Sequence, residues 1–352
     1  MLVESPPQER TAAPPSSPSP SWRPSTLCAA GLLASVGVLL VVVVASIAVG
    51  AKQIPLGDVW HALFQHTGTD NDVVIRDLRV PRTLLGLLVG SALGLSGAVL
   101  QALTRNPLAD PGLLGINAGA AAAVVSGISF FGVTSVTGYV WFAFAGAAAV
   151  SVLVYVLGGV RSATPVRLAL AGTAATAALI GYINAVQLLD NAALDKMRFW
   201  TVGSLASASM DTIWQVLPFL TFGTLLALSL ARPLNAMALG DDTARALGAG
   251  LNRTRALSMA AATLLCGAAT AACGPIAFVG LMVPHVVRSF TGPDQRWILP
   301  YAAVLSPVLL LGADVIARVV ARPSELQVGI VTALIGGPLF IYLVRRRRLA
   351  QL

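Results

Sequence analysis

The chain consists of long runs that contain no Asp, Glu, Lys or Arg, separated by short polar segments. These runs cover residues 24–51, 83–104, 111–160, 168–189, 212–231, 256–287, 297–313 and 326–344. A helix needs about 20 apolar residues to cross a bilayer, whereas a transmembrane barrel shows segments of about ten residues with alternating polarity. The pattern therefore predicts an all-α, polytopic membrane protein.

Two of the runs are long enough to hold more than one helix. In the run 111–160, the glycines and small residues between Gly132 and Gly138 predict a turn between two helices. In the run 256–287, Gly274 and Pro275 predict a helix that ends near Cys273 and a shorter helix after the proline, which fits poorly inside a helix. The count is then about ten transmembrane helices.

Composition excludes several classes of protein. Of the 352 residues, 56% are hydrophobic and 11% are charged, whereas soluble domains carry about 25% charged residues. The three cysteines lie in apolar runs, which excludes a disulfide scaffold. The chain also lacks the glycine-rich phosphate loop G-x-x-x-x-G-K-[ST] and any clustered nucleophile, acid or metal ligands. We therefore expect neither an ATPase site nor an enzyme active site, and no cofactor or metal.

The charges predict the orientation of the chain. The formal net charge is +8. Because basic residues concentrate on the cytoplasmic side of membrane proteins, this excess of Lys and Arg indicates how the chain is oriented in the membrane and does not indicate a nucleic-acid partner. With ten spans, the arginine run at 345–348 and the N-terminus are both cytoplasmic. Residues 1–26, rich in Pro and Ser, predict a disordered cytoplasmic tail. Residues 27–345 form the membrane domain, and residues 346–352 form a basic cytoplasmic tail.

Glycines recur on one face of the second predicted span, at Gly86, Gly90 and Gly94. Such a ridge allows the backbones of two helices to approach closely. Ionisable groups are rare within the spans, and Asp314 and Arg318, four residues apart, are expected to form a structural ion pair in preference to a proton relay. Asn184 and Gln187 on the fifth span are expected either to line a path or to form interhelical hydrogen bonds.

One polar loop, between the sixth and seventh spans, has the pattern of a short surface helix. Asp241 and Asp242 favour a helix start, and Gly248 favours a helix end. Leu239 and Leu247 offer apolar contacts at the two ends. The segment is either an ordinary connector or a helix on which a partner docks.

Several strings are similar to those of one family. They are R-V-P-R at 79–82, G-S-A-L-G-L-S-G-A-V-L-Q at 90–101, N-P-L-A-D-P-G-L-L-G at 106–115 and G-P-I-A-F-V-G-L-M-V-P-H-V-V-R at 274–288. Together with Glu325 to Pro338 they run in the family's order. The chain resembles the membrane permeases of ABC importers for iron-siderophores, haem and cobalamin. The N-terminal tail and Gln327, where proline is common in the family, are departures from its pattern.

The resemblance implies ten helices per subunit, a second permease subunit, two cytoplasmic ATPase subunits that use the ATP, and an extracytoplasmic solute-binding protein. It implies a multi-pass protein of the bacterial cell membrane surrounded by lipid. The coupling helix at about 239–248 would touch the ATPase through Leu239, Gly240, Asp241, Asp242, Ala244, Arg245, Leu247 and Gly248. Arg79, Arg82 and Arg318 would dock the binding protein, and Thr173, Asn184 and Gln187 on the fifth span would line the path.

An alternative function remains open from the sequence. A secondary transporter driven by an ion gradient would need buried carboxylates, and Asp314 is the one available in the spans. Among substrates, a ferric siderophore leads because it is the commonest in the family, followed by haem and cobalamin. The second permease subunit is either a copy of this chain or a different chain.

Overall fold

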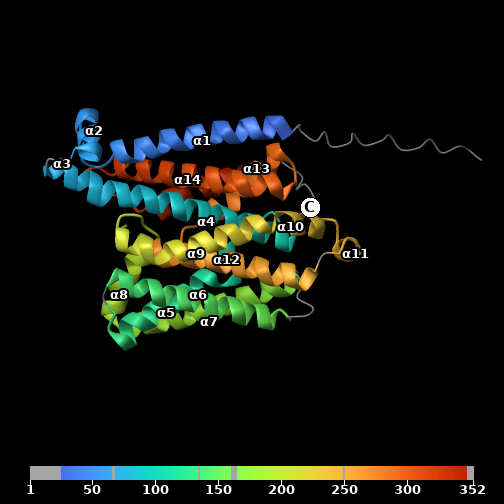
Figure 1. Cartoon of the computed structure of the whole chain (residues 1–352). Coiled ribbons are helices and arrows are strands. Elements are labelled where there is room, and N and C mark those ends of the chain that lie inside the picture. Colours follow the sequence, from blue (N-terminus) through green and yellow to red (C-terminus); the bar gives the residue numbers. More distant parts are fainter. Residues whose placement is uncertain (1–24, 66–67, 134, 160–164, 249, 347–352) are drawn as a thin grey trace, which may run out of the picture.

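The structure is a computed structural model that describes residues 25–65, 68–133, 135–159, 165–248 and 250–346. The described residues form a bundle of helices (Figure 1). The longer helices are α1 (Ser25–Ala48), α4 (Val80–Thr104), α5 (Ile116–Phe131), α6 (Val136–Leu157), α7 (Pro165–Leu189), α9 (Met210–Ser229), α12 (Leu251–Cys273), α13 (Val279–Thr291), α14 (Gln295–Val320) and α15 (Val328–Arg346). The shorter ones are α2 (Leu56–Phe64), α3 (Asp70–Val73), α8 (Asn191–Trp200), α10 (Ala231–Ala238), α11 (Asp241–Ala246), the π-helix η1 (Val74–Arg79) and the 3₁₀ helix η2 (Pro111–Leu114).

The bundle confirms the prediction of an all-α, polytopic membrane protein. Within the described residues, seven helices are long and apolar enough to cross a membrane, and Ile116–Phe131 and Val328–Tyr342 are shorter apolar helices. With α13, the ten longer helices correspond to the ten predicted spans. The turn at Gly132 and the break at Gly274 and Pro275 are also where the sequence placed them. The predicted tails at 1–26 and 346–352 lie almost entirely outside the described residues.

Two helices extend beyond the apolar runs that predicted them. The run 297–313 ends before Asp314, yet α14 continues to Val320, and α4 begins at Val80 although the run begins at residue 83. The charged residues at these ends, Arg82, Asp314 and Arg318, pair with one another inside the bundle, and a paired charge can remain within a membrane-spanning helix.

Helix α4 forms much of the core, and its glycine ridge makes the predicted close contacts. A Cβ atom added at Gly90 would lie 2.6 Å from the Cα of Pro307 in α14, and one added at Gly97 would overlap the carbonyl oxygen of Gly280 in α13. Side chains larger than hydrogen are therefore excluded where these helices cross. Helices α4 and α12 are buried over most of their length, whereas in α1 the buried residues are Cys28 and Ser46 and the others are exposed or half-buried on the described chain.

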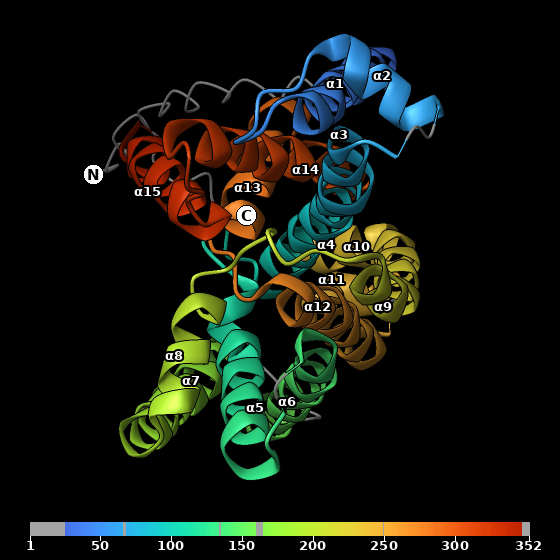
Figure 2. The ribbon, with the colours of Figure 1, turned by 90° about the vertical axis from the view of Figure 1, so that its left-hand side faces the viewer.

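The two ends of the bundle carry different short helices (Figure 1). The start of α1 lies at the same end as α10 and α11, which we call the α11 end. Helices α2, α3 and α8 lie at the opposite end, the α8 end. Viewed from the α8 end, α4 and α12 separate a group made of α1, α13, α14 and α15 from a group made of α5 to α8 (Figure 2).

Candidate transport site

At the α11 end, the loop that the sequence singled out forms a short helix on the surface. Helix α11 begins at Asp241 as predicted and ends at Ala246, two residues before Gly248, whose φ of +79° is left-handed. The Ala244 side chain is fully buried, whereas Leu239 and Leu247 are 63% and 65% exposed. One face of α11 thus packs on the protein, and two leucines flank the helix with their side chains uncovered.

Asp241 attaches α11 to two core helices. Its carboxylate accepts a hydrogen bond from Arg105 Nη2 just after α4, at 2.5 Å, and another from Arg255 Nη2 in α12, at 2.6 Å. Partial burial disfavours the ionised form, but the hydrogen bond from Arg105 and the charges of both arginines outweigh it, so the pKa of Asp241 lies below its ordinary value. The neighbouring Asp242 pairs with Arg245 at 2.8 Å within α11 itself. Asp241 therefore connects α11 to the end of α4 and to α12.

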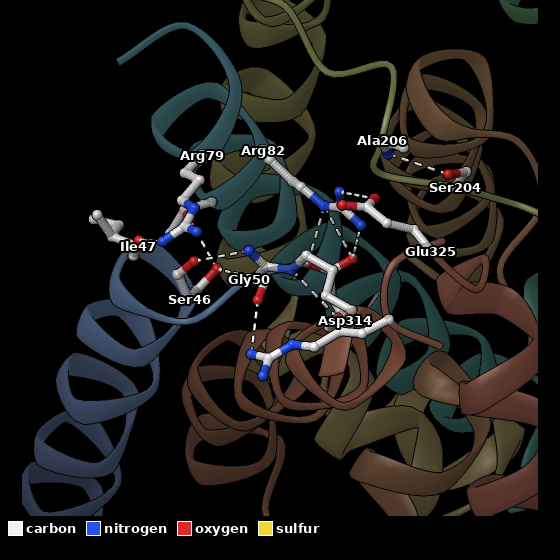
Figure 3. Close-up of polar contacts among 12 residues, drawn as sticks. Ser46, Ile47, Gly50, Arg79, Arg82, Ser204, Ala206, Asp314 and Glu325 are labelled. Atoms are coloured by element: carbon white, nitrogen blue, oxygen red, sulfur yellow. Dashed lines mark hydrogen bonds and ion pairs between the residues drawn. The ribbon is translucent and has the colours of Figure 1, made fainter. Parts of the chain in front are cut away.

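At the α8 end, Arg82 of α4 binds two carboxylates (Figure 3). Its Nε and Nη2 donate to both oxygens of Asp314 in α14, at 2.8 to 3.1 Å, and its Nη1 donates to Glu325 at 2.6 Å. Arg318 lies 3.0 Å from the same Asp314 carboxylate, which confirms the predicted ion pair. Asp314 is fully buried, and its ion-pair partners among the described residues are Arg82 and Arg318.

The arginines of this network also cap the end of α1. Arg79 Nη1 donates to the carbonyl oxygens of Ile47 and Ala48, at 2.9 and 2.7 Å, and Arg318 Nη1 donates to that of Ser46 at 3.0 Å (Figure 3). The last carbonyl groups of a helix have no partner within the helix, and basic side chains satisfy them well. The network therefore joins α1, α4 and α14.

The resemblance implied that Arg79, Arg82 and Arg318, at the outer ends of the second and ninth spans, dock the solute-binding protein, yet all three side chains are buried on the described chain. They are 4%, 8% and 2% exposed. The reason is that Asp314, Glu325 and the unpaired carbonyl groups at the end of α1 offer them partners inside the protein, which the spacing of the arginines alone does not reveal. Docking on these residues stays a prediction, and the buried geometry does not support it.

Two of the predicted path residues line one cavity. Asn184 and Gln187 of α7 face a cavity of about 450 Å³ between α5, α7 and α8. Its other polar side chains are Asn117 of α5, Thr176 of α7, Arg198 of α8 and Thr201. From Thr176 to Gln187 the wall follows α7 over twelve residues, about 16 Å along the helix axis. Polar groups along a membrane helix that face a cavity mark a possible route for a polar solute.

Thr173, the third predicted path residue, faces a different cavity. That cavity has a volume of about 340 Å³ and lies between the start of α7 and the segment that follows α4, with Asn106 and Asp110 among its lining residues. The Thr173 hydroxyl donates to the carbonyl oxygen of Ala169 at 2.8 Å. The structure thus brings together Asn184 and Gln187 but not Thr173.

Sequence reasoning missed several residues of these sites. Positions 176, 180, 184 and 187 follow each other at intervals of three or four, the spacing of one helix face, so this signal was available for Thr176 and Ile180. For Arg198, Glu325 and Ser46 we find no comparable signal, because their neighbours in space are far away in the sequence.

Known proteins are similar to this chain over most of its length. The sequence profile of the FecCD transport family matches residues 38–346. The chain belongs to the FecCD transport family. This confirms the resemblance found in the sequence. The match covers all ten longer helices except the first part of α1, as well as α11 and both cavities.

Relatives of this FecCD family chain include named permeases. It is 47% identical over 317 residues to the ferric enterobactin transport system permease protein FepD of Escherichia coli, covering 88% of this chain and 94% of the relative. It is 36% identical to the hemin transport system permease protein HmuU of Yersinia pestis, covering 88% and 93%. A solved structure described as an inward-facing metal-chelate type ABC transporter is also similar, with a TM-score of 0.81, 27% identity, and 91% of this chain and 100% of that chain covered.

Proposed function

We propose that this chain is the membrane permease subunit of an ABC importer and moves a ferric siderophore, or a related haem or cobalamin-like chelate, across a bacterial cell membrane. The observation that carries the proposal is α11, an exposed surface helix tied by Asp241 to two core helices of a FecCD family bundle. The relatives that are named as permeases of siderophore and hemin systems support it. The ATP would be used by separate subunits, so the chain needs no cofactor of its own.

In this proposal, residues 239–248 are the coupling helix that contacts an ATPase subunit. Leu239 and Leu247 supply the apolar contacts, and the exposed Asp242, Arg245 and Gly248, together with the half-buried Gly240, complete the surface. Ala244 packs α11 onto the bundle, and Asp241 links it to Arg105 and Arg255. Closure of the ATPase would push α11, and the ion pairs would transmit the movement to α4 and α12.

The proposed path runs beside α7. The cavity with Asn184 and Gln187 supplies side-chain amide groups, which can both donate and accept hydrogen bonds to a polar solute. Thr173, in the neighbouring cavity, lies one turn before Thr176 on the same helix, so the two cavities are successive parts of one route. A second permease subunit would cover the exposed face of α7 and enclose this route.

The partners follow from the two ends of the bundle. Two ATPase subunits would bind at the α11 end, which is then cytoplasmic together with both chain termini. The solute-binding protein would bind at the α8 end. The alternative, an ion-gradient-driven transporter, is disfavoured because the Asp314 carboxylate, its one candidate proton carrier, is held by Arg82 and Arg318.

The test is reconstitution. We expect chelate uptake into proteoliposomes that contain the chain, its ATPase and its binding protein when ATP is present, and no uptake by the chain alone under a proton gradient. Uptake by the chain alone would support the ion-gradient transporter. Absence of ATP-dependent uptake in the complete system would refute the importer.

A further inference from the structure

The cavity between α5, α7 and α8 carries an unbalanced positive charge. Its described lining residues include uncharged polar side chains and one basic side chain, that of Arg198, but no Asp or Glu. Within the described chain, no carboxylate lies in ion-pair distance of the Arg198 guanidinium, whereas Arg82, Arg105, Arg255 and Arg318 all pair with carboxylates. The charge of Arg198 is therefore available to whatever enters the cavity.

Arg198 lies on a well-anchored helix. The Asp190 side chain accepts hydrogen bonds from the backbone N–H groups of Ala192 and Ala193, at 3.0 and 3.2 Å, and so caps the start of α8. The side chains of Ala193 and Met197 are fully buried and fix α8 against its neighbours. The Arg198 side chain itself is exposed. The backbone that carries Arg198 is thus held against the neighbouring helices beside the cavity.

The other polar groups of the cavity suit a ligand rich in oxygen atoms. Asn117, Asn184 and Gln187 present side-chain amides, and Thr176 and Thr201 present hydroxyl groups, all of which can donate hydrogen bonds to carbonyl, carboxylate or phenolate oxygens. An anion that enters the membrane loses favourable hydration, and a nearby cation with little competing charge offsets part of that loss.

We propose that Arg198 is the charge-selecting residue of this cavity and that it favours anionic, oxygen-rich metal chelates, such as ferric catecholates or carboxylates, over neutral chelates. The inference rests on the proposed function, because it names the substrate class that the same path admits. A chelate with negatively charged oxygens gains attraction to Arg198 along the path, whereas a neutral hydroxamate chelate gains hydrogen bonds only.

The test places different charges at one position. In the complete transporter, Arg198→Cys is reacted with small thiol reagents that leave a cationic, a neutral or an anionic adduct, and uptake of a ferric catecholate is measured. The three native cysteines, Cys28, Cys266 and Cys273, are buried, so the reagents address the new thiol. We expect uptake to fall in the order cationic, neutral, anionic, by about tenfold overall, with ATP hydrolysis unchanged.

Lys196→Cys is the matched control, because Lys196 lies on the same helix but faces a different cavity, beside Tyr139 and Trp200. Its three adducts are expected to transport equally. Arg198→Lys keeps the charge and is expected to retain uptake. Equal uptake by the three Arg198→Cys adducts, a thiol that does not react, or loss of uptake in Arg198→Lys would each overturn the inference. A wild-type transporter without ATP-dependent uptake would instead refute the proposed function.

Discussion

Arg82 and Asp314, which are 232 residues apart in the sequence, form a two-point ion pair that joins α4 to α14. The guanidinium nitrogens of Arg82 lie 2.8 to 3.1 Å from the carboxylate oxygens of Asp314. The pair lies at the α8 end of the same two helices whose backbones meet at Gly90. Close helix packing and buried charge thus hold one interface together.

This ion pair leads to a prediction about stability. Asp314→Asn removes one partner and leaves the charges of Arg82 and Arg318 without their buried counterion, which costs about 3–5 kcal/mol of unfolding free energy. Glu325→Gln, at a position whose side chain is 35% exposed, is expected to cost less than about 1 kcal/mol. Denaturant unfolding of the detergent-solubilised protein measures both. A smaller loss for Asp314→Asn than for Glu325→Gln would contradict this account.

The glycine ridge of α4 gives a second prediction. Gly97→Ala places a methyl group against the Gly280 carbonyl oxygen, so α4 and α13 must separate, at a cost of about 1–3 kcal/mol. Gly181→Ala in α7 is the matched control, because a Cβ atom there has no described atom within 4 Å, and its effect is expected to stay within about 1 kcal/mol. Thermal unfolding of the two variants compares them, and equal melting temperatures would be evidence against close packing at Gly97.

The coupling helix gives a third prediction. Gly240 has a φ of +101°, which proline cannot adopt, so Gly240→Pro disturbs the start of α11. Asp241→Lys removes the carboxylate that binds Arg105 and Arg255 and introduces a positive charge that both arginines repel. Both substitutions are expected to lower ATP-dependent uptake by about tenfold or more while the ATPase subunits are still produced.

Gly250→Ala is the control for the coupling experiment. Gly250 lies close to α11 in the sequence but has an ordinary φ of −76°, and a Cβ atom there meets Arg253 at a normal 3.8 Å. Its uptake is expected to equal that of the wild type. Unchanged uptake in both Gly240→Pro and Asp241→Lys would remove the coupling role from α11.

A fourth prediction concerns pH. The pKa of Asp241 is lowered in the folded protein by Arg105 and Arg255, so its ion pairs stabilise the attachment of α11 above the ordinary carboxyl pKa of about 3.9 and are lost only as the pH falls through the lowered value. Hydrogen exchange of the α11 amides, corrected for intrinsic rates, should therefore not change between about pH 5 and 8. Asp241→Asn should exchange faster throughout this range. Loss of wild-type protection between pH 8 and 5 would show that another group controls α11.

Much of the fold was predictable because the bilayer restricts spanning segments to continuous helices. The run lengths gave about ten spans, and the glycine and proline signals placed the breaks near Gly132 and Gly274 correctly. The family followed from long strings such as N-P-L-A-D-P-G-L-L-G at 106–115. The ion pair of Asp314 with Arg318 followed from helical spacing alone. The start of α4 at Val80 did not follow from the sequence, because Arg82 was taken to lie just outside the second span.

The amino-acid sequence by itself determined the helical class, the family and the short helix at Asp241, since each depends on local composition, helical spacing or a continuous motif. Only the tertiary structure decided that Arg79, Arg82 and Arg318 face inward, that Asn184 and Gln187 share a cavity with Arg198, and that Asp241 is bound to Arg105 and Arg255. Those arrangements depend on how distant helices pack. The direction in which a charged side chain points is set by the partner that packing brings to it, and no local pattern in the sequence specifies that partner.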